Sequence, residues 1–355
     1  MTKIKVLVAE DSAVVRMLLV HLLETDPAIE VVGQVSDGQA AVAFVQATTP
    51  DAVLMDIHMP RMNGFEATRR IMETQPVPII VCSATADTRD TVVAFQAMEA
   101  GAIACIEKPL GSAWGDDQAK AAHLVQTVKL MSEVKVVRRT AAAGGSAKAR
   151  TVPLPAPSVA ARVKAVGIGA STGGPAVLQT LLAGLPEGFA APILVVQHLA
   201  PGFLPGLVAW LTASTRLAVE IARDGVYPLP GHVYLAPDDC HMGVSAGGAI
   251  VLSRASKESH VRPAVSFLFR SLAQVYGPRV IGVLLTGMGR DGADELRNMR
   301  DLGATTIAQD EASSVVHGMP GVAIALGAAS LVLASGQIAD TLVALVGLHT
   351  TAARS

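Results

Sequence analysis

Short apolar segments alternate with segments of helical spacing in both halves of this chain, and this alternation limits its fold more than any other feature. The predicted strands of the first half are residues 3–9, 30–35, 52–56, 77–83 and 103–107. Those of the second half are residues 163–168, 192–197, 217–222, 231–235, 249–253, 279–285 and 304–308, with a further candidate at 331–334. Strands that alternate with helices are typical of parallel sheets covered by helices on both faces. We therefore predict an α/β protein with a doubly wound sheet in each half, the second one mostly parallel.

The chain is too long for one hydrophobic core, and its middle has a composition unsuited to a core. Its 355 residues are expected to form two domains. Residues 131–161 change from basic to Ala-, Gly- and Ser-rich and then to Pro-rich sequence, which is typical of a linker. We predict a first domain at 1–125, a linker at 126–161 and a second domain at 162–350. A helix near 117–137 extends from the first domain, and residues 231–254 are expected to form a small insert with hairpin character.

The overall composition excludes several classes of protein. Hydrophobic residues make up 51% of the chain and charged residues 16%, so general disorder is excluded. The net charge of −2 favours neither nucleic acid nor an anionic membrane as a partner. The three cysteines, Cys82, Cys105 and Cys240, lack metal-ligand spacing and indicate a reducing cytosol. No charge-free apolar run reaches membrane-spanning length. We therefore predict a cytoplasmic protein that neither binds nucleic acid nor inserts directly into a membrane.

Polar side chains follow the predicted strands of the first half in a defined order. Glu10 and Asp11 follow the first strand, Asp56 ends the third, Ser83 ends the fourth and Lys108 follows the fifth. The carboxyl ends of parallel strands meet at the edge of the sheet where ligands bind. A cation is needed to join three carboxylates, and Mg²⁺ suits such a site because it also keeps water and phosphate oxygens as ligands. Asp56 is then placed to accept a phosphoryl group whose charge Lys108 neutralises.

A single acid at a strand end is most simply a solvated loop residue, but five matching positions in order favour a functional site. Residues 3–125 resemble the receiver domains of response regulators through Glu10-Asp11, Asp56, Ser83 and Lys108-Pro109. The resemblance implies a flavodoxin-like (βα)5 fold, phosphotransfer from a histidine kinase to Asp56, and a switch through Ser83 and Lys108. It also implies that the backbone carbonyl of His58 is a further Mg²⁺ ligand. The chain departs from the family at Cys105, where an aromatic residue is usual.

A Gly-rich turn holds a serine where the first strand of the second half ends. The segment Gly169-Ala170-Ser171-Thr172-Gly173 follows an apolar run, and Pro175 suits the first turn of a helix. Glycines allow close approach to the serine hydroxyl, which makes Ser171 a candidate nucleophile. The same spacing occurs in the nucleophile elbow of α/β-hydrolases, although that pattern alone is weak.

A histidine and an aspartate at two other strand ends complete a candidate catalytic triad. His198 follows the strand at 192–197, and its imidazole suits a general base near neutral pH. A second Gly-rich turn follows the strand at 279–285 and ends at Asp291, which can orient the histidine. The simpler role for Asp291 is a helix N-cap. His241 and His317 are candidates for supporting positions. The order Ser, His, Asp differs from that of α/β-hydrolases, so a different α/β fold is expected.

Residues 163–350 resemble the catalytic domain of chemotaxis protein-glutamate methylesterases. The shared segments are residues 167–175, Gln197-His198, residues 235–237 with His241, Arg262-Pro263, residues 285–292 and residues 308–320. The resemblance implies Ser171 as nucleophile, His198 as base, Asp291 as orienting acid, the Met288 backbone in the oxyanion hole and Thr172 in support of the histidine. It also implies methyl-accepting chemotaxis receptors as substrates, a chemotaxis histidine kinase as phosphodonor, and deamidation of glutamines. No catalytic-domain cofactor is expected. His317 replaces a frequent aromatic residue.

Three other interpretations stay open from the residues alone. A nucleotide-binding output domain is suggested by Gly167-Ile168-Gly169, but the sixth position is Thr172, and the second strand ends in Gln197-His198 without an acid for a ribose. A DNA-binding regulator conflicts with the near-neutral charge and the size of the second half. A receiver linked to a non-catalytic interaction module is the third interpretation.

Overall fold

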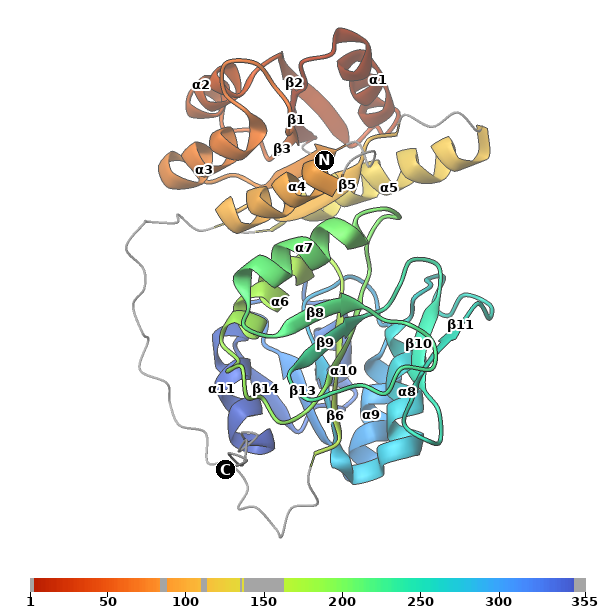
Figure 1. The fold of residues 1–355 in the computed structure, drawn as a ribbon. Helices are drawn as coiled ribbons and strands as arrows, with labels where there is room; N and C mark the ends of the chain where they lie inside the picture. The colour runs from red at the N-terminus through yellow and green to blue at the C-terminus, as the bar shows by residue number, and fades with distance from the viewer. Residues whose placement is uncertain (1–2, 84–87, 110–113, 135, 137–162, 348–355) are drawn as a thin grey trace. The chain divides into compact units, whose positions relative to one another are not determined.

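The computed structural model describes residues 3–83, 88–109, 114–134, 136 and 163–347 (Figure 1). It divides into two compact units, residues 1–145 and 146–355. No helix of the described residues is long and apolar enough to cross a membrane.

The first unit is built around a five-stranded parallel sheet of order β2-β1-β3-β4-β5. Its strands are β1 (Ile4–Ala9), β2 (Ile29–Val35), β3 (Ala52–Asp56), β4 (Ile79–Ser83) and β5 (Ala104–Glu107). Its helices are α1 (Ala13–Glu24), α2 (Gly38–Thr48), α3 (Gly64–Thr74), α4 (Thr88–Ala100) and α5 (Trp114–Ser132). This strand order is that of the flavodoxin-like fold, so the predicted fold class of the first half is confirmed. The order reverses between β1 and β3, which places the carboxyl ends of these two strands at the switch point.

Local sequence signals explain where three of these helices begin. Ser12, Asp37 and Asn63 precede α1, α2 and α3, and each side chain accepts a hydrogen bond from a backbone N–H in the first turn. Such residues satisfy amide groups that have no partner within the helix. The central strands β3 and β4 are almost entirely apolar and fully buried, as expected for a parallel sheet covered on both faces.

The second unit contains a seven-stranded sheet of order β14-β13-β12-β6-β7-β9-β8, and all its pairs are parallel. Its strands are β6 (Ala165–Ala170), β7 (Ile193–Gln197), β8 (Ala218–Ile221), β9 (His232–Leu235), β12 (Val280–Leu284), β13 (Thr305–Gln309) and β14 (Leu331–Leu333). Its helices are α6 (Gly174–Ala183), α7 (Leu204–Ser214), α8 (Val265–Tyr276), α9 (Ala293–Asp301), α10 (Met319–Ala325) and α11 (Ser335–Val346), with a short 3₁₀ turn at Gly277–Arg279. The mostly parallel α/β sheet predicted for this half is confirmed.

The direction of chain progression decides which face each helix covers. The chain steps from β6 to β7 in one direction and from β12 to β13 in the other. Because parallel crossovers are right-handed, these two steps place their helices on opposite faces. Figure 1 shows α6, α7 and α11 on one face of this sheet and α8 and α9 on the other. The topological switch point therefore lies between β6 and β12, where loops from both directions meet.

The observed elements differ from the sequence expectations at the hairpin insert, at strand β10 and at the start of the linker. The expected hairpin insert is the antiparallel pair β10 (His241–Val244) and β11 (Ile250–Ser253), whereas residues 232–235 are part of the main sheet. Strand β10 was missed as a separate strand because it has only four residues, and His241 and Gly243 interrupt its apolar pattern. Helix α5 continues to Ser132, so residues 126–132, which we assigned to the linker, are helical. The rest of the predicted linker lies mostly outside the described residues.

Candidate active site

Ser171 and His198 follow neighbouring strands at the same end of the sheet. Strands β6 and β7 pair in parallel up to the partners Ala170 and Gln197. Their ladder continues one step further, because the backbone N–H of His198 donates to the carbonyl of Ala170 at 3.0 Å. The sequence after each strand therefore places the candidate nucleophile and the candidate base side by side.

The loop that follows β12 brings Asp291 to His198. His198 Nε2 lies 3.0 Å from Asp291 Oδ2. The same carboxylate accepts the backbone N–H groups of Val265 at 2.6 Å and Ser266 at 3.0 Å, which open helix α8. Asp291 therefore caps a helix, as the simpler interpretation had it, but the helix is α8 and not its own.

The buried position of Asp291 affects its charge. Burial by itself raises the pKa of this carboxyl, but the hydrogen bonds and charge attraction from His198 and the hydrogen bonds from Ser266 outweigh it. The pKa of Asp291 consequently lies below its ordinary value. An ionised carboxylate beside the imidazole stabilises the positive charge that forms when a histidine accepts a proton.

With Nε2 held by Asp291, Nδ1 is the His198 nitrogen that is left to accept a proton from a nucleophile. None of the hydrogen bonds of the described residues joins Ser171 Oγ to the His198 ring. Catalytic hydrogen bonds in ligand-free enzymes are often long and tighten when substrate binds. The structure thus joins His198 to Asp291 and places Ser171 at the adjoining strand end, an arrangement that suits a catalytic triad.

The Gly-rich turn after β12 lies directly against the serine. The Ser171 N–H donates to the carbonyl of Thr286 at 3.0 Å. The position after Thr286 requires glycine, because a Cβ on Gly287 would come within 2.7 Å of Ser171 Cβ. Among the described residues, no acceptor is bonded to the backbone N–H of Met288. Such an N–H beside the nucleophile is suited to binding an oxyanion.

Three buried polar side chains that sequence reasoning did not assign as site residues hold these turns together. The Thr286 hydroxyl lies 3.0 Å from the carbonyl of Thr172. Gln309, at the end of β13, accepts the Thr286 N–H at 2.8 Å. Gln197, at the end of β7, donates to the carbonyl of Ser171 at 2.8 Å. The signal for them in the sequence was a polar residue at the end of an apolar strand.

The remaining candidates of this unit take secondary positions. Thr172 contributes its carbonyl, and its side chain makes no hydrogen bond to His198 among the described residues. His241 is fully buried, where Nδ1 accepts the N–H of Ala264 at 3.2 Å, just before the helix that Asp291 caps. His317 lies beside the Met288 turn, since it forms a β-bridge with Gly287.

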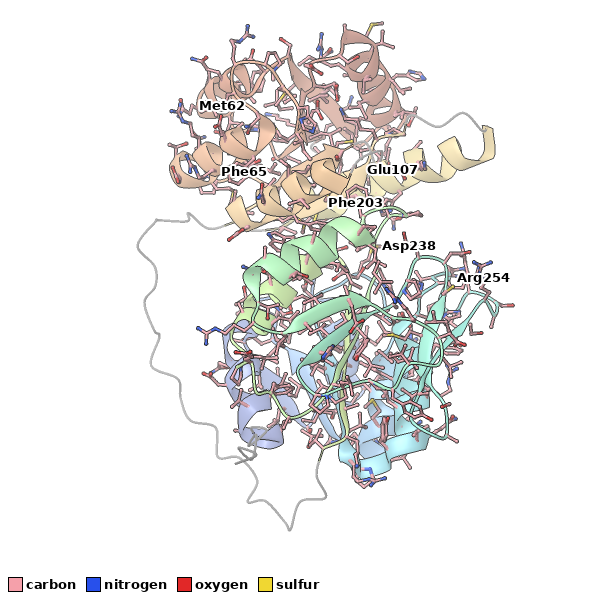
Figure 2. All side chains as sticks on the ribbon, in the orientation of Figure 1. Met62, Phe65, Glu107, Phe203, Asp238 and Arg254 are labelled. Carbon is pink, nitrogen blue, oxygen red and sulfur yellow. The ribbon has the colours of Figure 1, made fainter. Side chains whose placement is uncertain are left out.

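Two more loops join beside this end of the sheet. The Gly202 N–H, on the loop after β7, donates to Asp238 Oδ2, on the loop after β9, at 2.8 Å. Figure 2 labels Asp238 close to Phe203, the residue that follows Gly202. The loop that begins at His198 is therefore hydrogen-bonded to the loop that follows β9.

In the first unit the predicted acidic site is assembled around one lysine. One carboxylate oxygen from each of Glu10, Asp11 and Asp56 lies within 4.8 Å of the others. Lys108 Nζ lies 2.8 Å from both Glu10 Oε2 and Asp56 Oδ1. Ser83 is buried at the end of β4.

The charges of this acidic site depend on one another. Burial and the nearby Asp56 raise the pKa of Glu10 above its ordinary value, against the opposing effect of Lys108. Burial favours neutral Lys108, but its bonds to Asp56 and Glu10 outweigh this and raise its pKa. Within the described part of the chain, these carboxylates are the one group of acidic, His or Cys side chains that could hold a metal ion. They fit Mg²⁺ because it prefers carboxylate oxygens.

His58 and Cys105 are the two remaining residues that the sequence singled out in the first unit. His58 follows β3 by two positions, and its exposed side chain is not part of the group formed by Glu10, Asp11 and Asp56. Cys105 lies on β5 opposite Val81 of β4. Burial raises the pKa of the Cys105 thiol well above its ordinary value, so this residue is a neutral thiol at physiological pH.

Comparison with known proteins places both units. The family model of the response regulator receiver domain matches residues 6–114, and that of CheB methylesterase matches residues 166–342. A protein-glutamate methylesterase/protein-glutamine glutaminase of Nitrosospira multiformis is 50% identical over 344 residues, 97% of each chain. The chain belongs to this family. A relative of the same name from Geobacter metallireducens is 51% identical over 96% of this chain and 99% of its own.

A solved structure agrees with the sequence comparison. The CheB methylesterase catalytic domain of Thermotoga maritima is 42% identical, covers 52% of this chain and 98% of its own, and superposes with a TM-score of 0.50. The family expected from the motifs is therefore confirmed, and with it the enzyme class, a CheB-type hydrolase with a response regulator receiver domain. The nucleotide-binding, DNA-binding and non-catalytic interpretations are wrong.

Proposed function

We propose that this protein hydrolyses glutamate γ-methyl esters of methyl-accepting chemotaxis receptors, and deamidates particular glutamines there, with Ser171, His198 and Asp291 as its triad. The observation that carries this proposal is the meeting of the three residues at the switch point of one sheet, with His198 bonded to Asp291. The names of the relatives support the two reactions. The experiment that tests the proposal is methanol release from a methylated receptor.

The reaction begins when Ser171 Oγ attacks the ester carbonyl and His198 Nδ1 takes its proton. The resulting oxyanion is bound by backbone N–H groups that include Met288. As the tetrahedral species collapses, His198 returns the proton to the methoxy oxygen, and methanol leaves an acyl-serine. Water then attacks this ester, loses a proton to His198, and Ser171 departs with that proton. With glutamine, ammonia takes the place of methanol.

The first unit supplies control of this reaction. Asp56 is the proposed phosphoacceptor, and a chemotaxis histidine kinase is the proposed donor. Glu10, Asp11, Asp56 and the carbonyl of His58 would hold Mg²⁺, which would neutralise charge on the incoming phosphoryl group. Lys108 binds one oxygen of Asp56, Oδ1, and together with Ser83 it would bind the new phosphoryl oxygens. The proximity of the carboxylates and Lys108 supports this assignment.

The domain boundaries are also a proposal. Helix α5 belongs with the first sheet, because Val128 and Met131 are buried and Lys129 pairs with Asp26 at 2.8 Å. We therefore extend the first domain from the expected residue 125 to the end of α5, and keep the catalytic domain at 162–350. The cytoplasmic location stays a prediction.

Replacing the phosphoacceptor is expected to separate basal from stimulated activity. Asp56→Asn keeps the shape of the side chain but removes the nucleophilic carboxylate. We expect methanol release without phosphodonor to continue, and a small-molecule phosphodonor to give no stimulation. Asp51→Asn, an exposed acid outside the site, is the matched control and should respond like the wild type. Stimulation of Asp56→Asn by phosphodonor would show that control does not pass through this residue.

Removal of divalent cations is expected to abolish stimulated activity and to leave basal activity unchanged, as Asp56→Asn does. A chelator should abolish phosphorylation of the protein and its stimulation, because the carboxylates then repel the phosphodonor. Basal methanol release should be unchanged, since the triad uses no metal. Asp11→Asn should raise the Mg²⁺ concentration needed for phosphorylation. Phosphorylation that proceeds equally well in the chelator would contradict the metal site, and loss of basal activity there would contradict the division of roles.

A further inference from the structure

A glutamine side chain joins the backbones of the nucleophile and the base. Gln197 ends strand β7 and is 5% exposed. Its Nε2 donates to the carbonyl of Ser171 at 2.8 Å and to the carbonyl of His198 at 2.9 Å. One amide group therefore uses both of its protons on the two residues whose side chains have to meet during the reaction.

The rest of this amide is poorly suited to a purely stabilising role. Gln197 Oε1 is buried and has no hydrogen-bond partner among the described residues. A buried acceptor without a partner destabilises the folded state, and an apolar side chain of similar size would avoid this cost. The Gln197 side chain makes its hydrogen bonds only as a donor, through Nε2. Replacement by an apolar residue would therefore remove these two donated bonds and no accepted one.

The neighbouring helix leaves room for this amide. Gly174 opens α6, and a Cβ at this position would come within 2.1 Å of Gln197 Oε1. The N–H of Gly174 also donates to the carbonyl of Ser171 at 2.8 Å. The Ser171 carbonyl therefore has two donors, one from the helix and one from the strand that carries the base. Gly174 and Gln197 therefore donate to the same carbonyl, and they lie next to each other.

We propose that Gln197 is a positioning residue, which sets the separation of Ser171 from His198 by holding their two carbonyls with one amide. This inference rests on the proposed function of these two residues. Displacements of about 1 Å can cost about 100-fold in rate, because a proton transfer needs its partners within hydrogen-bond distance. Gln197 bonds only to backbone groups, so it should affect the chemical step and not the binding of the receptor.

The first test is Gln197→Met, which keeps the volume and removes both donors. With methylated receptor as substrate, we expect kcat to fall about 10- to 100-fold while KM stays close to that of the wild type. Thr306→Val is the matched control, because Thr306 is also buried in the same sheet and its hydroxyl donates to a backbone carbonyl, that of Ala328, at 2.7 Å. The control should lose stability and keep its kcat. Wild-type kcat in Gln197→Met, or a loss that only matches its unfolded fraction, would overturn the proposal.

The second test is the pH profile of Gln197→Glu. An ionised carboxylate has no proton for either carbonyl, whereas a neutral carboxyl can donate to one of them. Burial raises the pKa of such a group, so the neutral form should become populated as the pH falls toward mildly acidic values. We expect the kcat of this variant, divided by that of the wild type at each pH, to rise as the pH is lowered. A flat ratio would contradict the role of the donor protons.

The third test uses the glycine. Gly174→Ala should displace the amide and lower kcat as Gln197→Met does, although alanine favours the helix. Because both changes break the same contact, the kcat of the double variant should be no lower than that of the less active single variant. If the two losses multiply, Gln197 and Gly174 act separately and the shared contact is not what positions the serine. Ser171→Ala separates failure of the proposed triad from failure of the Gln197 role, since activity in that variant would reject the triad itself.

Discussion

Replacement of Ser171 by alanine is expected to reduce methanol release from a methylated receptor by about 10⁴- to 10⁶-fold. Alanine fits the turn between β6 and α6, but it has no oxygen to form the acyl intermediate. The oxyanion-binding N–H groups and the receptor-binding surface remain, so a small residual rate above the uncatalysed reaction should persist. Methanol release under saturating receptor, with and without phosphodonor, is the measurement.

The control for this experiment is another serine of the same unit. The Ser214 hydroxyl donates to the carbonyl of Trp210 within α7, at 3.1 Å, and takes no part in the proposed chemistry. Ser214→Ala should therefore keep the wild-type rate. Turnover in Ser171→Ala comparable to that of Ser214→Ala would exclude Ser171 as the nucleophile.

Asp291→Asn is expected to lower kcat by about 10⁴-fold, the second largest effect. Asp291 Oδ2 accepts from both His198 and the N–H of Val265. An amide nitrogen in its place would donate to Nε2 and drive the imidazole proton onto Nδ1, the nitrogen that has to accept the serine proton. If the amide turned the other way, its NH₂ would face the N–H of Ser266. In either orientation one favourable contact is replaced by opposed donors, so stability should also fall by about 1–3 kcal/mol.

The pH dependence of stability gives this prediction a second readout. The pKa of Asp291 is lowered in the folded protein, so its contribution to stability is present above the ordinary aspartate pKa and is lost as the pH falls through the folded value. The difference in unfolding free energy between wild type and Asp291→Asn should therefore shrink in acid. Asp294→Asn, whose exposed partner is Arg290, is the control and should change little. Normal kcat in Asp291→Asn would contradict the orienting role.

The local pattern of the chain was sufficient for the layers and for the residues at the strand ends. Short apolar strands buried on both faces have a period that differs from that of helices, so their places were predictable to within a residue or two. Acidic and hydroxyl residues after such strands could be assigned chemistry, because parallel strands point their carboxyl ends the same way. The Ser171 and Asp56 assignments both rest on this rule.

The strand order was less accessible. Nothing local in β12 indicates that it lies next to β6, although this pairing brings the Asp291 loop to His198. The partner of Asp291 in α8 was missed for the same reason: Val265 is 26 positions away in the chain. Gln197 was visible in the sequence only as part of a shared motif, since its role depends on where two carbonyls lie.

The chain's own pattern thus determined which residues stand at the ends of buried strands and what chemistry their side chains can perform. Only the tertiary structure decided which strand ends are neighbours, which nitrogen of His198 meets Asp291, and which amide joins the backbones of the serine and the histidine. The reason is physical: apolar period and turn residues act over a few positions, whereas strand order and hydrogen bonding at the switch point arise from packing between segments distant in the chain.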